Sequence, residues 1–499
     1  MKHSYAALFL ITLSVFLLTS SGHLDFTDEY MIFFQAESLV LNQSPAVPQA
    51  RQHDIWYGTE GVDGEPHAGF GLTHPLVIAP FYGLGKLIGY SPGIPVRSRD
   101  LIHYMAAIGS SSFFAALLVC LFHLVLSRLG VSPRISFTAS LFLAFATPVW
   151  PYTGTLFSEI WTALLLLTAL AALERETRQE QGGILPVVLC GVCLGLALMT
   201  RPNHGAAFPV FGLALLLGPG STTRRAQRFL LLGAIGTVFL GTTMLLNYLE
   251  FGDPFQRGHP GWVEGGKIIS DFLIPTPLHL GLYGNLFSPG KSILLLAPPL
   301  LLALLGLRLL WRQRKPIAIA CGGCGLTYIL IVSRHSQWEA GYSWGPRYLL
   351  PVLPLLLVGL APLLRKGERT WPRRALVFLC LIGVLVQLPA VFTSSFEVQS
   401  RGGYYDANFD YMLNHNAVGE QWALFLHYLG ETFQGRVLEG PLHRGLDLWS
   451  VMLLKDSVPV EVILILLALP AAMLAGGLIL LRVSLKTLGN EKYGNTSLG

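Results

Sequence analysis

Charged residues are scarce in this 499-residue sequence. They make up 13% of the chain, and hydrophobic residues make up 52%, whereas soluble domains average about 25% charged residues. The mean hydropathy is +0.54. Apolar runs long enough to cross a bilayer recur along most of the length. We therefore expect an all-α, multi-pass membrane protein, and a soluble globular protein is excluded.

Cysteine is also rare, and none of the six cysteines falls in a long loop. The pairs Cys190/Cys193 and Cys321/Cys324 have the spacing of redox or metal-binding motifs. Glycine and leucine flank both pairs inside expected helices, which favours close helix packing over a zinc site. No disulfide framework is therefore expected in the loops.

A nucleotide-binding P-loop is missing as well. The stretch "GNLFSPGKS" comes nearest, but Gly284 and Gly290 stand one residue further apart than the motif allows. There is also no internal repeat and no low-complexity tract. Nothing in the sequence supports ATP-driven transport.

Twelve apolar stretches are expected to span the membrane, with the N-terminus in the cytoplasm. They are 5–20, 101–127, 135–150, 158–173, 184–200, 205–218, 229–248, 292–307, 317–333, 347–364, 375–394 and 460–481. A further stretch, 71–90, contains Pro75, Pro80, Gly83, Gly85 and Lys86, which we expect to break it into pieces too short to span. We therefore expect an interfacial or re-entrant segment there. The opening stretch also has features of a secretory signal, and we favour a retained helix.

The basic residues support this topology. Most of the 34 Lys and Arg residues fall in the short loops that it assigns to the cytoplasm, as the positive-inside rule requires. Three long segments, 21–100, 249–291 and 395–459, then lie outside. We expect a transmembrane module over 1–394, an outer C-terminal loop region over 395–459, and a last helix with a cytoplasmic tail over 460–499.

The first outer segment begins with "HLDFTDEYMIFFQAESLV", which places three carboxylates after the first span: Asp25, Asp28 and Glu29. An amphipathic helix is expected from Asp28 to Asn42, lying along the membrane surface. Its apolar face would hold Ile32, Phe33, Ala36, Leu39 and Val40, and its polar face Asp28, Gln35, Ser38 and Asn42. Asp28 would start the polar face and point into a cavity. Acidic residues also simply stabilise a first helical turn, by about 0.3–1 kcal/mol. Ionisable groups at a membrane boundary are more often functional.

Cationic groups recur on the same side of the expected membrane. Arg201 follows the fifth span, Lys291 precedes the eighth, and Arg347 starts the tenth. Lysine and arginine at the end of a span often only extend their charged groups into water and bind no ligand. If they converge, they form an anion clamp in which arginine suits bidentate contact with phosphate.

Histidines and acids gather between 51 and 75: His53, Asp54, Glu60, Asp63, Glu65, His67 and His74. Their spacing matches no recognised metal-ligand set. No cofactor is therefore predicted with certainty, and a divalent metal stays open.

The order of several motifs resembles that of one enzyme family. An acidic pair after the first span is followed by "GLTHPLVIAPFYGLGKLIG", "LNYLEFGDPF", "GLYGNLFSPGKSILLLAPPLLLALLGL" and "SWGPRYLLPVLPLLL". Together they resemble polyprenyl-phosphate-dependent glycosyltransferases of the C type (GT-C), near the protein mannosyltransferases and lipid A aminoarabinose transferases. The resemblance covers most of residues 5–394.

This resemblance implies an enzyme of the cell's inner membrane with an extracytoplasmic active site. It implies an Asp general base and an inverting transfer of a sugar from a polyprenyl-phosphate donor. Carried onto this chain, the catalytic pair is Asp28 and Glu29, and Arg347, Arg201 and Lys291 bind the donor phosphate. We expect His74, Trp338, Tyr342 and Trp344 to line the substrate site. The expected partners are the donor, membrane lipid and a glycan, lipid or protein acceptor, with no nucleic acid.

Segment 395–459 is too short for the large soluble domain of some relatives, which leaves the acceptor undefined. The main alternative function is a secondary transporter or lipid flippase. Transporters show inverted repeats and place charges near the bilayer midplane, whereas the ionisable residues here gather at span ends and in outer loops. A third alternative is a non-catalytic scaffold, which would tolerate substitution of the acidic pair.

Overall fold

The structure is a computed structural model of the whole chain. It describes residues 2–55, 58–91, 93–178, 183–256, 258, 262–264, 267–269, 276–365, 370–400, 413–436 and 445–494.

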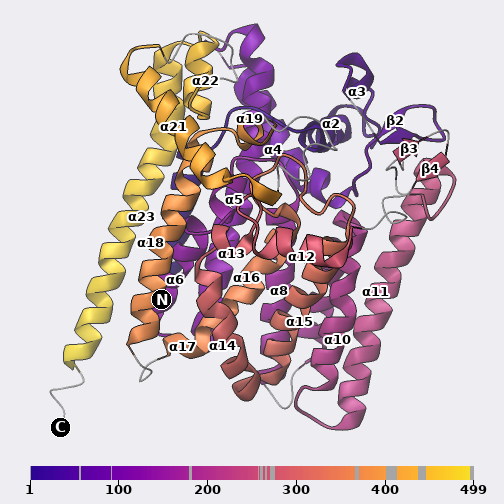
Figure 1. The fold of residues 1–499 in the computed structure, drawn as a ribbon, viewed down its shortest axis with the longest axis vertical. Coiled ribbons are helices and arrows are strands. Elements are labelled where there is room, and N and C mark those ends of the chain that lie inside the picture. Colours follow the sequence, from indigo (N-terminus) through magenta and orange to yellow (C-terminus); the bar gives the residue numbers. More distant parts are fainter. Residues whose placement is uncertain are drawn as a thin grey trace.

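The described chain forms a helical bundle, which confirms the predicted fold class (Figure 1). Helices fill most of the apolar stretches: α1 (Lys2–Leu18), α5 (Arg99–Arg128), α6 (Pro133–Phe145), α8 (Glu159–Arg178), α9 (Ile184–Thr200), α10 (Ala207–Leu216), α11 (Thr222–Phe251), α14 (Pro299–Gln313), α15 (Lys315–Arg334), α18 (Trp371–Phe392) and α23 (Val460–Gly494). Buried apolar side chains from most of these helices form a continuous core, against which α23 packs. The protein is a multi-pass membrane protein.

Two expected spans are interrupted helices, because proline lacks the N–H that a helix interior needs. Pro298 separates α13 (Ile293–Leu296) from α14. Stretch 347–364 alternates 3₁₀ and α turns: η3 (Arg347–Val352), α16 (Leu353–Leu357), η4 (Val358–Leu360) and α17 (Ala361–Leu364). Arg347 starts this stretch.

By length and apolar composition, six helical segments of the described chain can cross a membrane. They are Val96–Arg128, Thr222–Phe251, Lys315–Arg334, Arg347–Leu364, Trp371–Phe392 and Val460–Leu485. Shorter apolar helices, such as Pro133–Phe145 and Ile184–Thr200, pack among them. The total of twelve spans stays a prediction.

Helices α11 and α23 lie at opposite edges of the bundle (Figure 1). Only 6% and 17% of their apolar windows are buried inside the protein. Their exposed apolar side chains therefore suit contact with lipid.

The prediction that prolines break 71–90 into pieces is wrong. A single 17-residue helix, α4 (Thr73–Gly89), occupies this stretch and packs along α5. Pro75 falls in its first turn, where no intrahelical N–H bond is required. Pro80 lies inside the helix, and packing against α5 and α2 outweighs the hydrogen bond that it removes.

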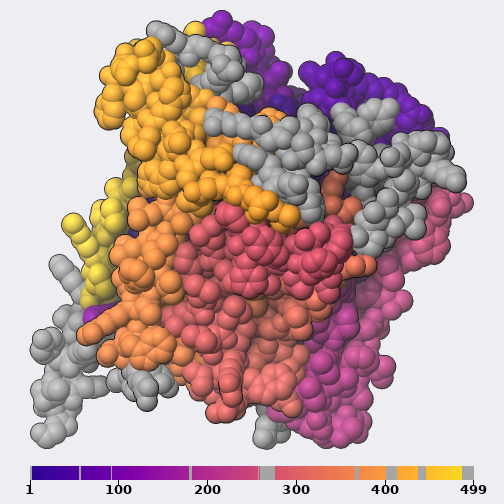
Figure 2. Space-filling view, viewed as in Figure 1, coloured from indigo at the N-terminus to yellow at the C-terminus, as the bar shows by residue number. Residues whose placement is uncertain are grey.

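The connecting segments gather at one end of the bundle, uppermost in Figure 1, which we call the loop end. Its elements include α2 (Thr27–Leu41), α3 (Gln49–Gln52), α19 (Ser395–Gln399), α21 (Ala417–Phe433) and α22 (Trp449–Lys455), with two antiparallel hairpins, β1 (Thr59–Glu60) with β2 (Pro66–His67) and β3 (Trp262–Glu264) with β4 (Lys267–Ile269). The remaining short helices are η1 (Val96–Ser98), α7 (Val149–Tyr152), η2 (Pro202–Ala206) and α12 (Leu278–Leu286). Figure 2 shows the C-terminal part, orange to yellow, covering one side of this end.

The long segments contact one another at the loop end. The backbone N–H of Val62 donates to the carbonyl of Glu250 at 2.8 Å. The Thr276 hydroxyl donates to the carbonyl of His335 at 2.9 Å. The backbone N–H of Trp449 donates to the carbonyl of Ser20 at 3.1 Å. Loops far apart in sequence are thereby brought together above the bundle.

Helix α2 occupies the predicted range, but it does not have one solvated face. Gln35 and Ser38, expected on the polar side, are buried. The reason is α3, whose Gln49 side chain donates to the Ser38 hydroxyl at 3.0 Å. Val40, expected on the apolar side, is exposed. Helix α2 is therefore part of a packed loop-end core rather than a helix lying on a surface.

Candidate active site

The start of α2 is held by the carboxyl group of Glu29. Its Oε2 atom accepts hydrogen bonds from the backbone N–H groups of Asp25 and Phe26 at 3.1 and 3.2 Å. Its Oε1 atom accepts one from Leu156 at 2.7 Å. Burial raises the pKa of Glu29 to about 8, although these N–H donors act to lower it. Glu29 thus ties the turn before α8 to the turn that carries Asp28.

Asp28 faces away from this backbone cluster and meets Arg347, 319 residues later. The Arg347 Nη2 atom donates to Asp28 Oδ2 at 3.0 Å. Arg347 Nε lies 3.7 Å from Oε1 of Glu159, the first residue of α8. The guanidinium stacks 3.9 Å above the ring of Phe157, a cation–π contact. Two carboxylates and one aromatic ring therefore fix Arg347.

Arg201 approaches the same carboxylate from the end of α9. Its Nη2 atom lies 3.8 Å from Asp28 Oδ2. Its guanidinium lies over the rings of Phe70 and Tyr348, at 5.2 and 5.6 Å. The Tyr348 hydroxyl is also 3.5 Å from Arg347 Nη2. We call Asp28, Glu159, Arg201, Arg347 and Tyr348 the Asp28 centre.

Several polar atoms of the Asp28 centre are buried and lack hydrogen-bond partners among the described residues. They are Nε and Nη2 of Arg201, Nε of Arg347 and both carboxylate oxygens of Glu159. Buried polar atoms in native proteins are nearly always satisfied, so such a concentration points to a ligand. The spare arginine N–H groups are suited to anion oxygens.

The centre is layered by depth. Glu159 and Arg347 have side-chain exposures of 3% and 6%, whereas Arg201 and Asp28 reach 17% and 27%. Asp28 and Arg201 therefore form the accessible rim, and Glu159 holds Arg347 from below. A ligand entering from the loop end meets the carboxylate and the freer guanidinium first.

His74 lies beside this rim at the start of α4. The neighbouring Thr73 hydroxyl pairs with the hydroxyl of Thr200 at 2.6 Å, which brings α4 against the end of α9. Burial, together with the nearby charge of Arg201, lowers the pKa of His74 to about 3. His74 is thus a neutral, buried imidazole, and its Nδ1 atom has no hydrogen-bond partner among the described residues.

Lys291 lies near enough to Arg347 for the two positive charges to interact, and the protein itself supplies its hydrogen-bond partners. Its side chain is fully buried, and Nζ donates to the carbonyls of Gly341 and Ser343, both at 2.7 Å. Burial lowers the pKa of Lys291 to about 7, with Glu339 acting to raise it. No contact joins Lys291 to Asp28 in the described chain. It closes the loop before Arg347, in which Ala340, Gly341 and Gly345 have positive φ.

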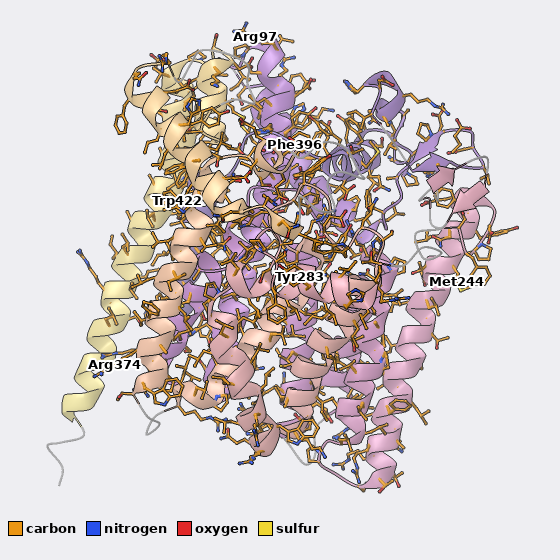
Figure 3. The ribbon with its side chains drawn as sticks, viewed as in Figure 1. Arg97, Met244, Tyr283, Arg374, Phe396 and Trp422 are labelled. Atoms are coloured by element: carbon orange, nitrogen blue, oxygen red, sulfur yellow. The ribbon has the colours of Figure 1, made fainter. Side chains whose placement is uncertain are left out.

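The three aromatic residues expected to line the substrate site lie in different surroundings. Trp338 is fully buried and packs on Gly284, where a Cβ atom would lie 2.1 Å from its ring. Tyr342 packs edge-to-face on Phe396, which in turn contacts Phe26. Phe396 is labelled at the loop end in Figure 3, far from Arg374 at the other end. Trp344 lines a cavity that also borders His23 and Asp447.

The acids and histidines of 51–75 do not form one site. Arg51 pairs with Glu60 at 2.7 Å, and His67 lies 3.2 Å from Asp63. His53 stacks on Phe34. His74 lies apart from all of them, beside Arg201. These groups stabilise the loop end through local pairs.

Sequence reasoning did not assign Glu159, Phe157 or Tyr348 to the site. A signal was present for Glu159, because an acidic residue opens an otherwise apolar span in "FSEIW". The aromatic contacts of Phe157 and Tyr348 depend on packing between distant segments. No periodic pattern reveals them.

Comparison with known proteins gives similarity in structure alone. No protein-family model matches the chain, and no curated protein sequence matches it. The structure is similar to that of ArnT from Cupriavidus metallidurans in the apo state, at 16% identity and a TM-score of 0.45 over 95% of this chain and 74% of that one. It is also similar to ArnT from the same organism bound to undecaprenyl phosphate, at 16% identity and a TM-score of 0.48 over 95% and 75%. At this level of similarity, the function of this chain has to be inferred from its own residues.

Proposed function

We propose that this chain is a membrane glycosyltransferase of the GT-C type. It moves a sugar from a polyprenyl-phosphate donor to an acceptor on the extracytoplasmic face of the inner membrane. The observation that carries the proposal is the Asp28 centre. One accessible carboxylate lies within 4 Å of two guanidinium groups that have spare N–H donors.

These groups match the two needs of the reaction. The acceptor hydroxyl loses its proton as its oxygen attacks the anomeric carbon, and Asp28 takes that proton as general base. The bond between the anomeric carbon and the phosphate oxygen breaks, and the negative charge on the departing phosphate is stabilised by Arg201 and Arg347. The sugar passes through an oxocarbenium-like state. A single displacement inverts the anomeric configuration.

The ion pair between Asp28 and Arg347 explains how the resting centre stays stable. Without a donor, two guanidinium groups face two carboxylates, so the buried charges balance. A bound phosphate competes for Arg201 and Arg347, which releases Asp28 toward the acceptor. Glu159, buried below, keeps Arg347 in position throughout.

The other predicted site residues have supporting roles. Glu29 positions Asp28 through the backbone of the α2 start. Lys291 holds the loop that delivers Arg347. His74 contributes a neutral polar group at the rim.

The orientation follows from the basic residues of the sequence. Most of the Lys and Arg residues occur in the short loops that lie away from the long segments. This distribution supports a loop end, with the Asp28 centre, that lies outside the cytoplasm. A lipid-linked substrate can reach a centre at this boundary while its chain stays in the bilayer.

The test is an incubation of the purified protein with a panel of radiolabelled polyprenyl-phosphate sugars and membrane acceptors. We expect transfer of label from one donor and release of free polyprenyl phosphate. A secondary transporter or flippase would instead move lipid across proteoliposomes without cleaving the sugar–phosphate bond. Translocation with an intact donor would reject the enzyme proposal.

A further inference from the structure

A second cluster of ionisable groups lies at the loop end, outside the Asp28 centre. The His23 ring stands between two carboxylates: Nε2 is 2.7 Å from Asp25 Oδ1, and Nδ1 is 3.2 Å from Asp447 Oδ1. Within the described ranges, these three residues form the one group whose nitrogen and oxygen ligand atoms lie within 4.8 Å of one another. His23 and Asp25 precede α2, whereas Asp447 precedes α22.

The cluster is buried but adjoins open space. The side-chain exposures of His23, Asp25 and Asp447 are 5%, 20% and 13%. All three line a cavity with about 560 Å³ of empty volume, in which open space at the mouth is included. Other polar groups around it include Ser21, Glu29 and Ser343. The cavity therefore adjoins the cluster, and His23 Nδ1 and Asp447 Oδ1 themselves are buried.

The cluster is also rigidly supported. The Ser394 hydroxyl donates to Asp25 Oδ2, so both oxygens of that carboxylate are held. The backbone N–H of Asp447 donates to the carbonyl of Phe392 at 2.8 Å. The indole of Trp449 donates to the carbonyl of Leu17 at 2.7 Å. Separate segments thereby position the three side chains before any ligand arrives.

The ligand atoms also have the spacing that a metal site requires. Two ligand atoms on one tetrahedral metal lie roughly 3.4 Å apart, given bonds of about 2.1 Å, and His23 Nδ1 and Asp447 Oδ1 are separated by 3.2 Å. Asp447 Oδ1 is buried, and its partner in this cluster is His23 Nδ1. A metal-binding histidine usually donates its other N–H to a carboxylate, and Asp25 stands at that position.

We propose that His23 Nδ1 and Asp447 bind a divalent metal ion, with Asp25 orienting the imidazole. A ligand set of one imidazole nitrogen and one carboxylate oxygen suits Zn²⁺ or Mn²⁺ better than Mg²⁺. Water from the cavity completes the coordination. Binding displaces the proton that the ring holds between the two carboxylates, so metal uptake releases a proton.

At this location the ion has a structural role beside the Asp28 centre. It joins the chain before α2, which carries Asp28, to the C-terminal segment before α22. Phe26 and Phe157 line the same cavity, and Phe157 supports the guanidinium of Arg347. The ion fixes one wall of the centre without touching the Asp28 carboxylate.

The test uses the full-length protein in detergent, stripped with a chelator and titrated with Zn²⁺, and separately with Mn²⁺, in a calorimeter. We expect saturable binding of one ion per chain, release of a proton, and a melting temperature that rises with metal. Asp447→Asn should bind at least tenfold more weakly. Asp63→Asn, at the His67 pair, should bind like the parent protein and serves as the matched control.

The readout does not depend on transferase activity, so this inference can fail while the proposed function stands. Absence of saturable binding to the parent protein in the micromolar range would show that a proton alone bridges the carboxylates. Equal binding by Asp447→Asn and the parent would place any ion elsewhere. Either result overturns the proposal, even if the variant melts at a lower temperature.

Discussion

The Asp28 centre and the surroundings of Lys291 are both charged, both buried in part, and both were expected to bind phosphate. At the Asp28 centre, arginine and glutamate atoms lack hydrogen-bond partners among the described residues. Lys291 instead donates to two carbonyls and interacts with Glu339. A charged group whose hydrogen bonds the protein itself satisfies stabilises the fold, whereas charged groups with spare hydrogen-bonding atoms around an accessible rim indicate a ligand. The variants described below test whether the Asp28 centre and the surroundings of Lys291 differ in this way.

Arg347→Met should have the largest effect, on both stability and transfer. It leaves Glu159 buried without its cation, which costs about 3–5 kcal/mol of the free energy of unfolding. Transfer should fall below detection. Thermal unfolding and the radiolabel assay measure the two effects.

The double variant Arg347→Met/Glu159→Gln separates these two effects. Removal of the uncompensated charge should restore most of the lost melting temperature, while transfer stays absent. Recovery of transfer together with stability would mean that Arg347 acts only on the fold.

Arg201→Gln should weaken donor binding with little change in stability, because Arg201 lies at the accessible rim. Loss of a hydrogen bond to a charged group costs about 1.5–3 kcal/mol, or roughly 10- to 150-fold in donor KM. Steady-state kinetics with a varied donor concentration measure this. An unchanged KM would exclude Arg201 from the phosphate site.

Lys291→Met should instead lower the stability and leave donor binding nearly unchanged. The two carbonyls that Lys291 satisfies lose their donor, so the melting temperature should fall by an amount that corresponds to about 1–3 kcal/mol. Donor KM of the folded variant should stay within about threefold of the parent, since no phosphate contact is lost. A stable variant with a greatly raised KM would restore Lys291 as a phosphate ligand.

His74→Gln should have the smallest effect, which appears only in acid. The folded-state pKa of His74 is lowered to about 3 from an ordinary value near 6.5. Its contribution to stability is therefore complete above pH 6.5 and is lost as the pH falls toward 3. Melting temperatures across this range should decline less steeply in the variant, and equal slopes would refute a buried neutral imidazole.

Much of the architecture could be predicted from apolar runs alone. Each of the twelve expected spans contains helix, because a long apolar stretch in lipid must satisfy its backbone internally. Asp28 and Arg347 could also be selected from the sequence, because charged residues at the ends of spans require partners. The prediction that 71–90 is broken into pieces was wrong, because packing against α5 allows α4 to continue through Pro80.

The chemistry of individual side chains was harder to predict. Whether Lys291 faces a ligand or a carbonyl depends on the left-handed loop at Ala340 and Gly341, and a sequence pattern does not show where carbonyl groups point. The meeting of His23 with Asp447 joins distant segments, and neither residue lies in a motif. Such contacts depend on tertiary packing.

The most direct test of the Asp28 centre is a single-turnover experiment with Asp28→Asn at saturating donor. The control is Asp54→Asn, at a residue with φ of 51°, a conformation that asparagine adopts readily. We predict that Asp28→Asn binds the donor and transfers sugar about 100- to 10,000-fold more slowly than the parent, as expected for loss of a general base. Transfer at the parent rate would contradict the assignment of Asp28 as the base.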